Sequence, residues 1–166
     1  MYKCAFVLAL ALAAAPALAK DKPTALVFHD DTQTGISFQY PRGWRNIVIA
    51  DDSSKAEATT DDRQSRLTIE SVMKPAEGGV TGVIEKKVPG GAVGGGSGDW
   101  KCIEGDIESG KRHAAFCGRR MGKTSSDLLI IGITTASAKA FQKLGGKALL
   151  LQIAASTKGF KATAEE

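Results

Sequence analysis

Two histidines are the side chains best suited to acid–base or metal chemistry in this sequence of 166 residues. His29 is followed by Asp30 and Asp31, which together offer one imidazole and two carboxylates. Consecutive residues of a strand point to opposite faces, however, so three such side chains rarely converge on one metal ion. We therefore expect these residues to form a solvated turn, and we assign no catalytic residue and no metal site to them.

His113 is the second candidate, and Asp106 is its charged partner in the hairpin register described below. A histidine beside a carboxylate can act as a general base, but covalent catalysis also needs a nucleophile next to it. No serine is placed there, and Cys117 is expected to be oxidised. We interpret the two residues as a surface histidine–aspartate pair. A small metal-dependent or hydrolytic enzyme that uses His29 or His113 stays open as an alternative.

Two glycine-containing motifs fall short of known catalytic patterns. Gly122-Lys123-Thr124 resembles the end of a phosphate-binding loop, but Cys117 occupies the position where that motif requires its first glycine. The run Gly95-Gly96-Ser97-Gly98-Asp99 resembles a nucleophile elbow, but its last residue should be glycine. These departures favour a polar turn and a loop serine. We predict neither nucleotide binding nor a cofactor.

A cluster of basic side chains is the main candidate for binding. Its spacing indicates either a solvated surface or a patch for an anionic partner, such as a lipid headgroup, an envelope polymer or an acidic protein face. The formal net charge of +4 is too weak to indicate nucleic-acid binding. The cluster consists of Lys111, Arg112, Arg119, Arg120 and Lys123.

The first 19 residues have the layout of a secretory signal peptide. Lys3 precedes an apolar stretch over residues 5–15, and small residues end at Ala19. This stretch is too short to span a bilayer, and no later segment is long and apolar enough to do so. We predict cleavage after Ala19, which would leave residues 20–166 as one periplasmic or secreted domain with a formal charge of +3, because Lys3 is removed.

Cys102 and Cys117 are the cysteines of the predicted mature chain, and an isolated pair in an exported protein is typical of a structural disulfide. Ser109-Gly110 reads as a two-residue hairpin turn. Pairing residues equidistant from this turn places the two cysteines opposite each other and Asp106 opposite His113. Their Cα atoms would lie about 4.5–5.5 Å apart, which is within disulfide range.

Alternating or continuous apolar runs predict strands over residues 26–28, 36–40, 47–49, 66–73 and 127–135. The intervening polar runs 30–35 and 51–62 are expected to be a turn and a loop. A short helix is expected over 81–88, followed by a flexible glycine-rich loop over 89–98. Trp44 and Trp100 are expected to pack in the core or at its rim.

The last predicted element is a long helix that Ser137 caps and that ends near residue 157. Its apolar side chains are spaced for one face, and Gly145-Gly146 are expected to weaken or kink it. The expected buried residues are Phe141, Leu144, Ala148, Leu151 and Ala155. Together these elements predict an α+β domain with an antiparallel sheet flanked by helices.

Residues 35–44, Gly-Ile-Ser-Phe-Gln-Tyr-Pro-Arg-Gly-Trp, resemble the opening motif of PsbP-like domains. The order of the later elements is also similar to that family. The resemblance implies an α/β/α sandwich and a non-catalytic binding or assembly role. The glycine-rich loop and the disulfide-linked hairpin depart from the family pattern, so the family's function is not transferred to this chain.

We therefore predict an exported, non-catalytic binding or assembly module of the cell envelope, with no cofactor. Its partner would be another envelope protein or an anionic envelope component, and the oligomeric state is left open. A first alternative is an inhibitor or immunity-type protein that blocks an exported enzyme. The second alternative is the small enzyme described above.

Overall fold

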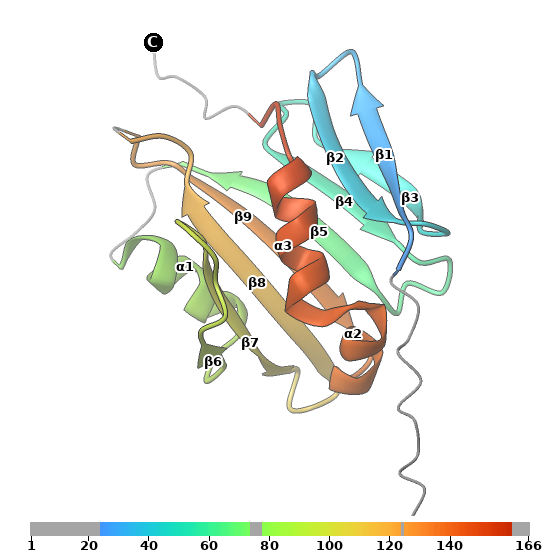
Figure 1. Cartoon of the computed structure of the whole chain (residues 1–166), viewed down its shortest axis with the longest axis vertical. Helices are drawn as coiled ribbons and strands as arrows, with labels where there is room; N and C mark the ends of the chain where they lie inside the picture. The colour runs from blue at the N-terminus through green and yellow to red at the C-terminus, as the bar shows by residue number, and fades with distance from the viewer. Residues whose placement is uncertain (1–23, 74–77, 124, 161–166) are drawn as a thin grey trace, which may run out of the picture.

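The computed structural model describes residues 24–73, 78–123 and 125–160. The predicted signal peptide, residues 1–19, lies outside the described residues. Seven strands form one antiparallel sheet, and a separate hairpin of two strands packs near it (Figure 1). The order in the large sheet is β3 (Arg45–Ile49), β4 (Lys55–Thr59), β5 (Arg66–Val72), β9 (Leu128–Thr135), β8 (Arg112–Arg120), β7 (Lys101–Ile107) and β6 (Ala92–Val93).

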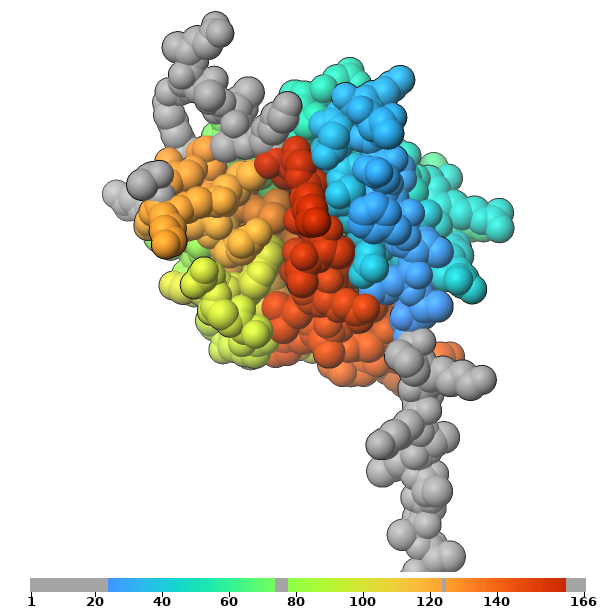
Figure 2. Space-filling view, turned by 45° about the horizontal axis from the view of Figure 1, so that its top comes forward, coloured from blue at the N-terminus to red at the C-terminus, as the bar shows by residue number. Residues whose placement is uncertain are grey.

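Both faces of the large sheet are covered. Helix α1 (Gly79–Lys87) covers one face through a core that includes Ile84 and Phe116. On the other face lie α2 (Ala138–Leu144), α3 (Gly146–Ser156) and the hairpin β1 (Leu26–Asp31) and β2 (Ile36–Pro41). Figure 2 shows α3 running between the blue β1–β2 hairpin and the orange and yellow residues of the other half of the sheet. The predicted α+β fold with an antiparallel sheet between helices is confirmed.

The burial of the central strands accounts for their apolar sequence patterns. Strand β9 is buried on both faces, which is why its residues 128–133 are almost continuously apolar. Strand β8 lies beside it and alternates between the two cores: Ala115 and Cys117 belong to the larger core, whereas Ala114 and Phe116 belong to the smaller one.

The predicted hairpin forms with the predicted register. Cys102 pairs with Cys117 and Asp106 with His113 across β7 and β8. The two cysteines are disulfide-bonded, and their Cα atoms lie 4.1 Å apart, slightly closer than expected. The connecting loop is longer than predicted, because the strands end at Ile107 and Arg112 and leave residues 108–111 in the turn.

Three segments predicted as irregular contain strand residues. The predicted loop 51–62 includes β4, in which Ala56 and Ala58 are fully buried or nearly so. Small alanines at alternate positions give a weak apolar signal, so a buried strand was missed there. The predicted turn 30–35 begins two residues too early, since β1 continues through Asp31. The glycine-rich loop 89–98 also contains the short strand β6.

The predicted C-terminal helix is two helices. Gly145 has a φ of 121°, a conformation that favours glycine, and it separates α2 from α3. Ser137 caps α2 as predicted, accepting a hydrogen bond from the backbone N–H of Ala140 at 3.2 Å. The break resets the helical phase, so the expectation is wrong for Ala148 and Ala155, which are exposed, whereas Leu151 is partly buried against the larger core. The buried residues of α3 include Leu149, Leu150, Ile153 and Ala154.

Candidate functional site

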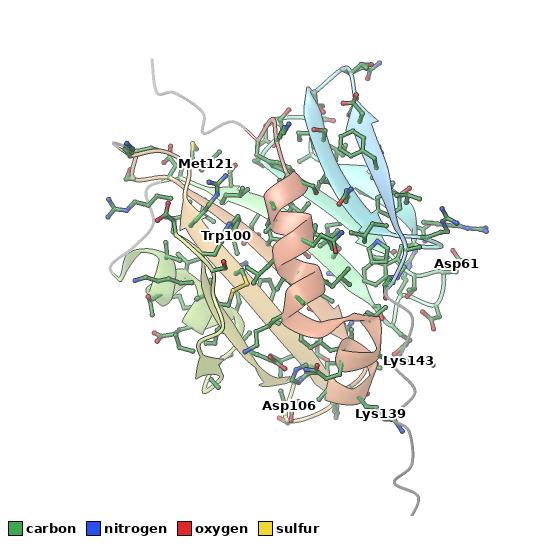
Figure 3. The ribbon with its side chains drawn as sticks, viewed as in Figure 1. Asp61, Trp100, Asp106, Met121, Lys139 and Lys143 are labelled. Atoms are coloured by element: carbon green, nitrogen blue, oxygen red, sulfur yellow. A yellow bond between two sulfur atoms is a disulfide. The ribbon has the colours of Figure 1, made fainter. Side chains whose placement is uncertain are left out.

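An open cleft of about 800 Å³ lies at one end of the β7–β8 hairpin. Three segments contribute to its wall: the start of α1, the residues that lead into β7, and the end of β8 with the loop after it. Figure 3 labels Trp100 and Met121 in this region, far from Asp106 at the opposite end of the same hairpin. The described lining residues are Gly78, Gly79, Val80, Gly98, Asp99, Lys101, Arg119, Arg120, Met121, Gly122 and Lys123.

Four of these side chains are cationic and one is a carboxylate. The hairpin register brings Lys101, at the start of β7, beside Gly118 near the end of β8, which places it close to the arginines that follow. Within the described part of the chain, none of the four cations forms an ion pair. The cleft therefore carries an uncompensated formal charge of +3 from Lys101, Arg119, Arg120, Lys123 and Asp99.

Arg119 is held against an aromatic ring. Its guanidinium carbon lies 5.2 Å from the centroid of the Trp100 ring, a geometry in which the cation is attracted to the face of the indole. Trp100 itself packs against the larger core, in agreement with the packing role expected for it. The Nε atom of Arg119 is buried and has no hydrogen-bond partner among the described residues.

The start of α1 adds positive potential to the same cleft. Gly78 precedes the helix with a φ of 97° and provides no side-chain cap, and the first turn contains no acidic residue. The first N–H groups of a helix have no partner within it, and the helix dipole favours negative charge beside them. The start of α1 and the basic side chains therefore line the same cleft.

The predicted basic cluster is only partly one site. Arg119, Arg120 and Lys123 all line the cleft. Lys111 and Arg112 lie at the other end of β8, a separation of roughly 25 Å for a strand of this length. Arg112 donates a hydrogen bond from Nη2 to the carbonyl oxygen of Gln64 at 3.1 Å. The prediction grouped these residues because they are close in sequence, but the extended strand β8 separates its two ends in space.

Lys101 and the start of α1 were missed from the sequence. Lys101 stands alone in its segment, and nothing local indicates that it joins cations about twenty residues later. The hairpin register was the available signal, since it already placed position 101 opposite position 118. The contribution of α1 depends on its packing against β7 and β8, which the local sequence pattern does not encode.

His113 is buried, with 5% of its surface exposed. The prediction of a surface histidine–aspartate pair is therefore wrong about its exposure. Its Nδ1 lies 2.8 Å from Oδ1 of Asp106, and its Nε2 lies 3.1 Å from Oε1 of Glu104. The predicted partner is confirmed, whereas the second carboxylate was missed, although it lies two residues away on the same face of β7. Both ring nitrogens are occupied by carboxylates, which leaves neither free to act as a base toward a substrate.

Glu104 connects this histidine to the helices. Its second carboxylate oxygen lies 3.2 Å from Nζ of Lys147 in α3, and Gln142 of α2 donates to its first oxygen at 3.3 Å. The His113 ring also lies 5.5 Å from the Phe141 ring. These contacts join the β7–β8 hairpin to α2 and α3, so the geometry of the cluster accounts for it as a structural network.

His29 and its neighbours do not converge. The His29 ring lies 5.2 Å from the Phe38 ring on β2, while Asp31 bonds to the turn that follows β1. Within the described ranges, no three histidine, cysteine or carboxylate side chains are close enough to hold a metal ion. The residues nevertheless belong to a strand as far as Asp31, and not wholly to the solvated turn that was predicted.

We expect the Asp31 carboxylate to titrate below its usual pH range. The backbone N–H of Gln33 and then the hydroxyl of Thr34 donate to it, both at 2.9 Å, and these bonds lower its pKa. Because the folded-state pKa is depressed, the resulting stabilisation is present above the unfolded-state value and disappears as the pH falls through the folded-state value. Carboxyl-carbon NMR should show the low midpoint, and Thr34→Val should raise it. An unchanged midpoint in that variant would contradict the assignment.

The two incomplete motifs lie in loops. Gly122 and Lys123 follow β8 and line the cleft, whereas Thr124 lies outside the described residues. Ser97 is exposed in the glycine-rich loop, and its carbonyl oxygen accepts a hydrogen bond from the backbone N–H of Trp100 at 3.2 Å. It follows no long strand and precedes no helix, as a nucleophile elbow would require.

The residues of the 35–44 motif serve packing. Ile36 and Phe38 are fully buried and Trp44 is 7% exposed, all within the larger core. The backbone N–H of Trp44 donates to the carbonyl oxygen of Pro41 at 3.1 Å, which closes the corner after β2. This motif therefore reports on the fold and contributes nothing to the cleft.

Comparison with solved structures bears on that fold. The solution structure of cyanobacterial PsbP (CyanoP) from Synechocystis sp. PCC 6803 matches with a TM-score of 0.50 and 17% identity, over 89% of this chain and 98% of that one. The fold is PsbP-like. A crystal structure from Bacteroides thetaiotaomicron VPI-5482 matches with a TM-score of 0.40 and 15% identity, over 79% of this chain and 47% of that one. No protein-family model and no curated protein matches the sequence.

Within the described ranges, no helix is long and apolar enough to cross a membrane.

Proposed function

We propose that this protein is an exported, non-catalytic binding or assembly module of the cell envelope, and that its cleft holds an anionic group of its partner. The observation that carries the proposal is the set of four cations around one cleft without ion-pair partners among the described residues. Clustered like charges repel one another in the free protein. An anionic partner offsets that repulsion, so its binding to the cleft is electrostatically favourable.

Two further features support the remaining parts of the proposal. Residues 1–19 have a signal-peptide layout, and the Cys102–Cys117 disulfide fits an oxidising compartment outside the cytoplasm. His113, the residue with the best local geometry for acid–base chemistry, is buried between two carboxylates. Its environment suits a structural role better than a catalytic one.

Site-specific photo-crosslinking tests the proposal. A photoreactive phenylalanine analogue at Gly122 would stand in the cleft, and the backbone there is compatible with a side chain, since the nearest atom to a Cβ is that of Ser125 at 3.8 Å. Lys111, exposed at the far end of β8, is the matched control position. In intact envelopes we expect a defined cross-linked product from position 122 and not from position 111.

Adding Arg120→Glu to the position-122 variant should reduce that product, because it reverses a charge at the cleft. Equal products from the two positions, or none from either in the exported and folded protein, would contradict the proposed function. If the captured partner is a single exported enzyme, the inhibitor hypothesis becomes the form that the binding role takes.

A further inference from the structure

We propose that the anionic group bound in the cleft is a phosphate, carried by a soluble phosphate compound or by a phospholipid headgroup. This inference rests on the proposed function, namely that the cleft binds an anion. It goes further by naming the chemistry of that anion and the role of each cleft residue. Three observations carry it: the amount of charge in the cleft, the three segments that supply its donors, and the packing of Arg119 against Trp100.

The charge of the cleft matches a multiply charged anion. Four cations face one carboxylate, so a singly charged carboxylate ligand would leave most of the positive potential uncompensated. A phosphate monoester or a pyrophosphate carries about two or more negative charges near neutral pH. Asp99 opposes such a ligand by repulsion, and it is exposed at the rim of the cleft, beside Gly98.

The potential donors come from three separate segments of the cleft wall. Backbone N–H groups come from the start of α1, arginine side chains come from the end of β8, and Lys101 comes from β7. A planar carboxylate accepts along two main directions, whereas a tetrahedral phosphate presents three or four oxygens around one centre. Helix N-termini and arginine forks are both well matched to that geometry.

The Arg119 side chain is already held in place before any ligand binds. The Trp100 ring beneath its guanidinium restricts its orientation, which reduces the entropy lost when a ligand binds. Its Nε atom is buried by the surrounding protein, which further fixes the guanidinium in place. The volume of about 800 Å³ also exceeds that of a lone phosphate, which leaves room for the rest of a phosphate ester.

Calorimetric titration with inorganic pyrophosphate tests the proposal, with sodium acetate as the comparison anion. We expect pyrophosphate to bind, to bind more weakly as ionic strength rises, and to bind far more tightly than acetate. Arg120→Glu should weaken pyrophosphate binding by about tenfold or more, as expected for loss of a charged hydrogen bond. Lys111→Glu changes the net charge equally at an exposed position outside the cleft, and it should have little effect.

Asp99→Asn provides a test in the opposite direction. Removing the single carboxylate of the cleft lining should tighten pyrophosphate binding several-fold, because a repulsive charge beside the ligand is lost. A variant that gains affinity cannot be explained by loss of folding. Unchanged or weaker binding in Asp99→Asn would contradict the assigned geometry.

Vesicle flotation distinguishes the two sources of the phosphate. Binding to vesicles of phosphatidylcholine with phosphatidic acid, lost in Arg120→Glu and kept in Lys111→Glu, supports a lipid headgroup. Binding to pyrophosphate without binding to these vesicles supports a soluble phosphate compound. Equal affinity for acetate and pyrophosphate, or equal effects of the two charge reversals, would overturn the phosphate assignment. If it fails while the cross-link from position 122 persists, the proposed function stands and the anion is of another class.

Discussion

Replacing both Cys102 and Cys117 with alanine is expected to lower the free energy of unfolding by about 3 kcal/mol. The two residues are separated by 15 positions and are disulfide-bonded across β7 and β8. The bond restricts the unfolded chain, which loses less conformational freedom on folding. A loss of this size should lower the melting temperature by roughly 6–12 °C in a domain of this length. Thermal unfolding followed by circular dichroism measures it.

Alanine is the better substitution because both side chains are buried in the larger core, where a serine hydroxyl would need a partner. The wild-type protein in reducing buffer is the matched control. It should melt near the temperature of the double variant, and reductant should not shift the variant itself. An oxidised wild type and a double variant with the same melting temperature would show that the bond does not stabilise the fold.

Local pairing and apolar runs were predictable from the sequence. The hairpin of β7 and β8 has a turn with strongly turn-forming residues, and its register follows by counting outward from that turn. The apolar run of β9 indicated a strand buried on both faces. These features depend on residues close together in the chain, so they leave a clear local pattern.

The features that were missed depend on distant partners. Strand β4 is held by β3 and β5, and its small alanines carry little signal of their own. The burial of His113 results from packing of α2 against β8, which a hairpin considered alone does not contain. The cleft likewise requires α1 to meet both β7 and β8. The basic residues of the cleft could therefore be identified from the sequence, whereas the cleft itself could not.

One such distant contact has a large predicted energetic effect, and it involves a glycine that looks unremarkable in sequence. Gly132 lies in the middle of β9, directly opposite Phe116 of β8. A Cβ at position 132 would lie 2.1 Å from Cε1 of the Phe116 ring, so the ring occupies the space where a side chain would be. The aromatic ring thereby covers a glycine that would otherwise weaken the strand.

Gly132→Ala is expected to destabilise the protein by about 1–3 kcal/mol, because the ring of Phe116 must leave its place in the smaller core. Urea denaturation followed by fluorescence measures the loss. Gly122→Ala is the matched control, since the nearest atom to a Cβ there lies at 3.8 Å. That variant should retain the wild-type stability within about 0.5 kcal/mol.

A double-mutant cycle separates the clash from any general effect of alanine in β9. Phe116→Ala removes every ring atom that a Cβ at position 132 would meet, at its own cost in buried area. In that background Gly132→Ala should be neutral or stabilising, because alanine is favoured over glycine within a strand by about 0.5–1 kcal/mol. The sign of the substitution would thus depend on the residue opposite. The same loss in both backgrounds would show that the ring does not explain the glycine.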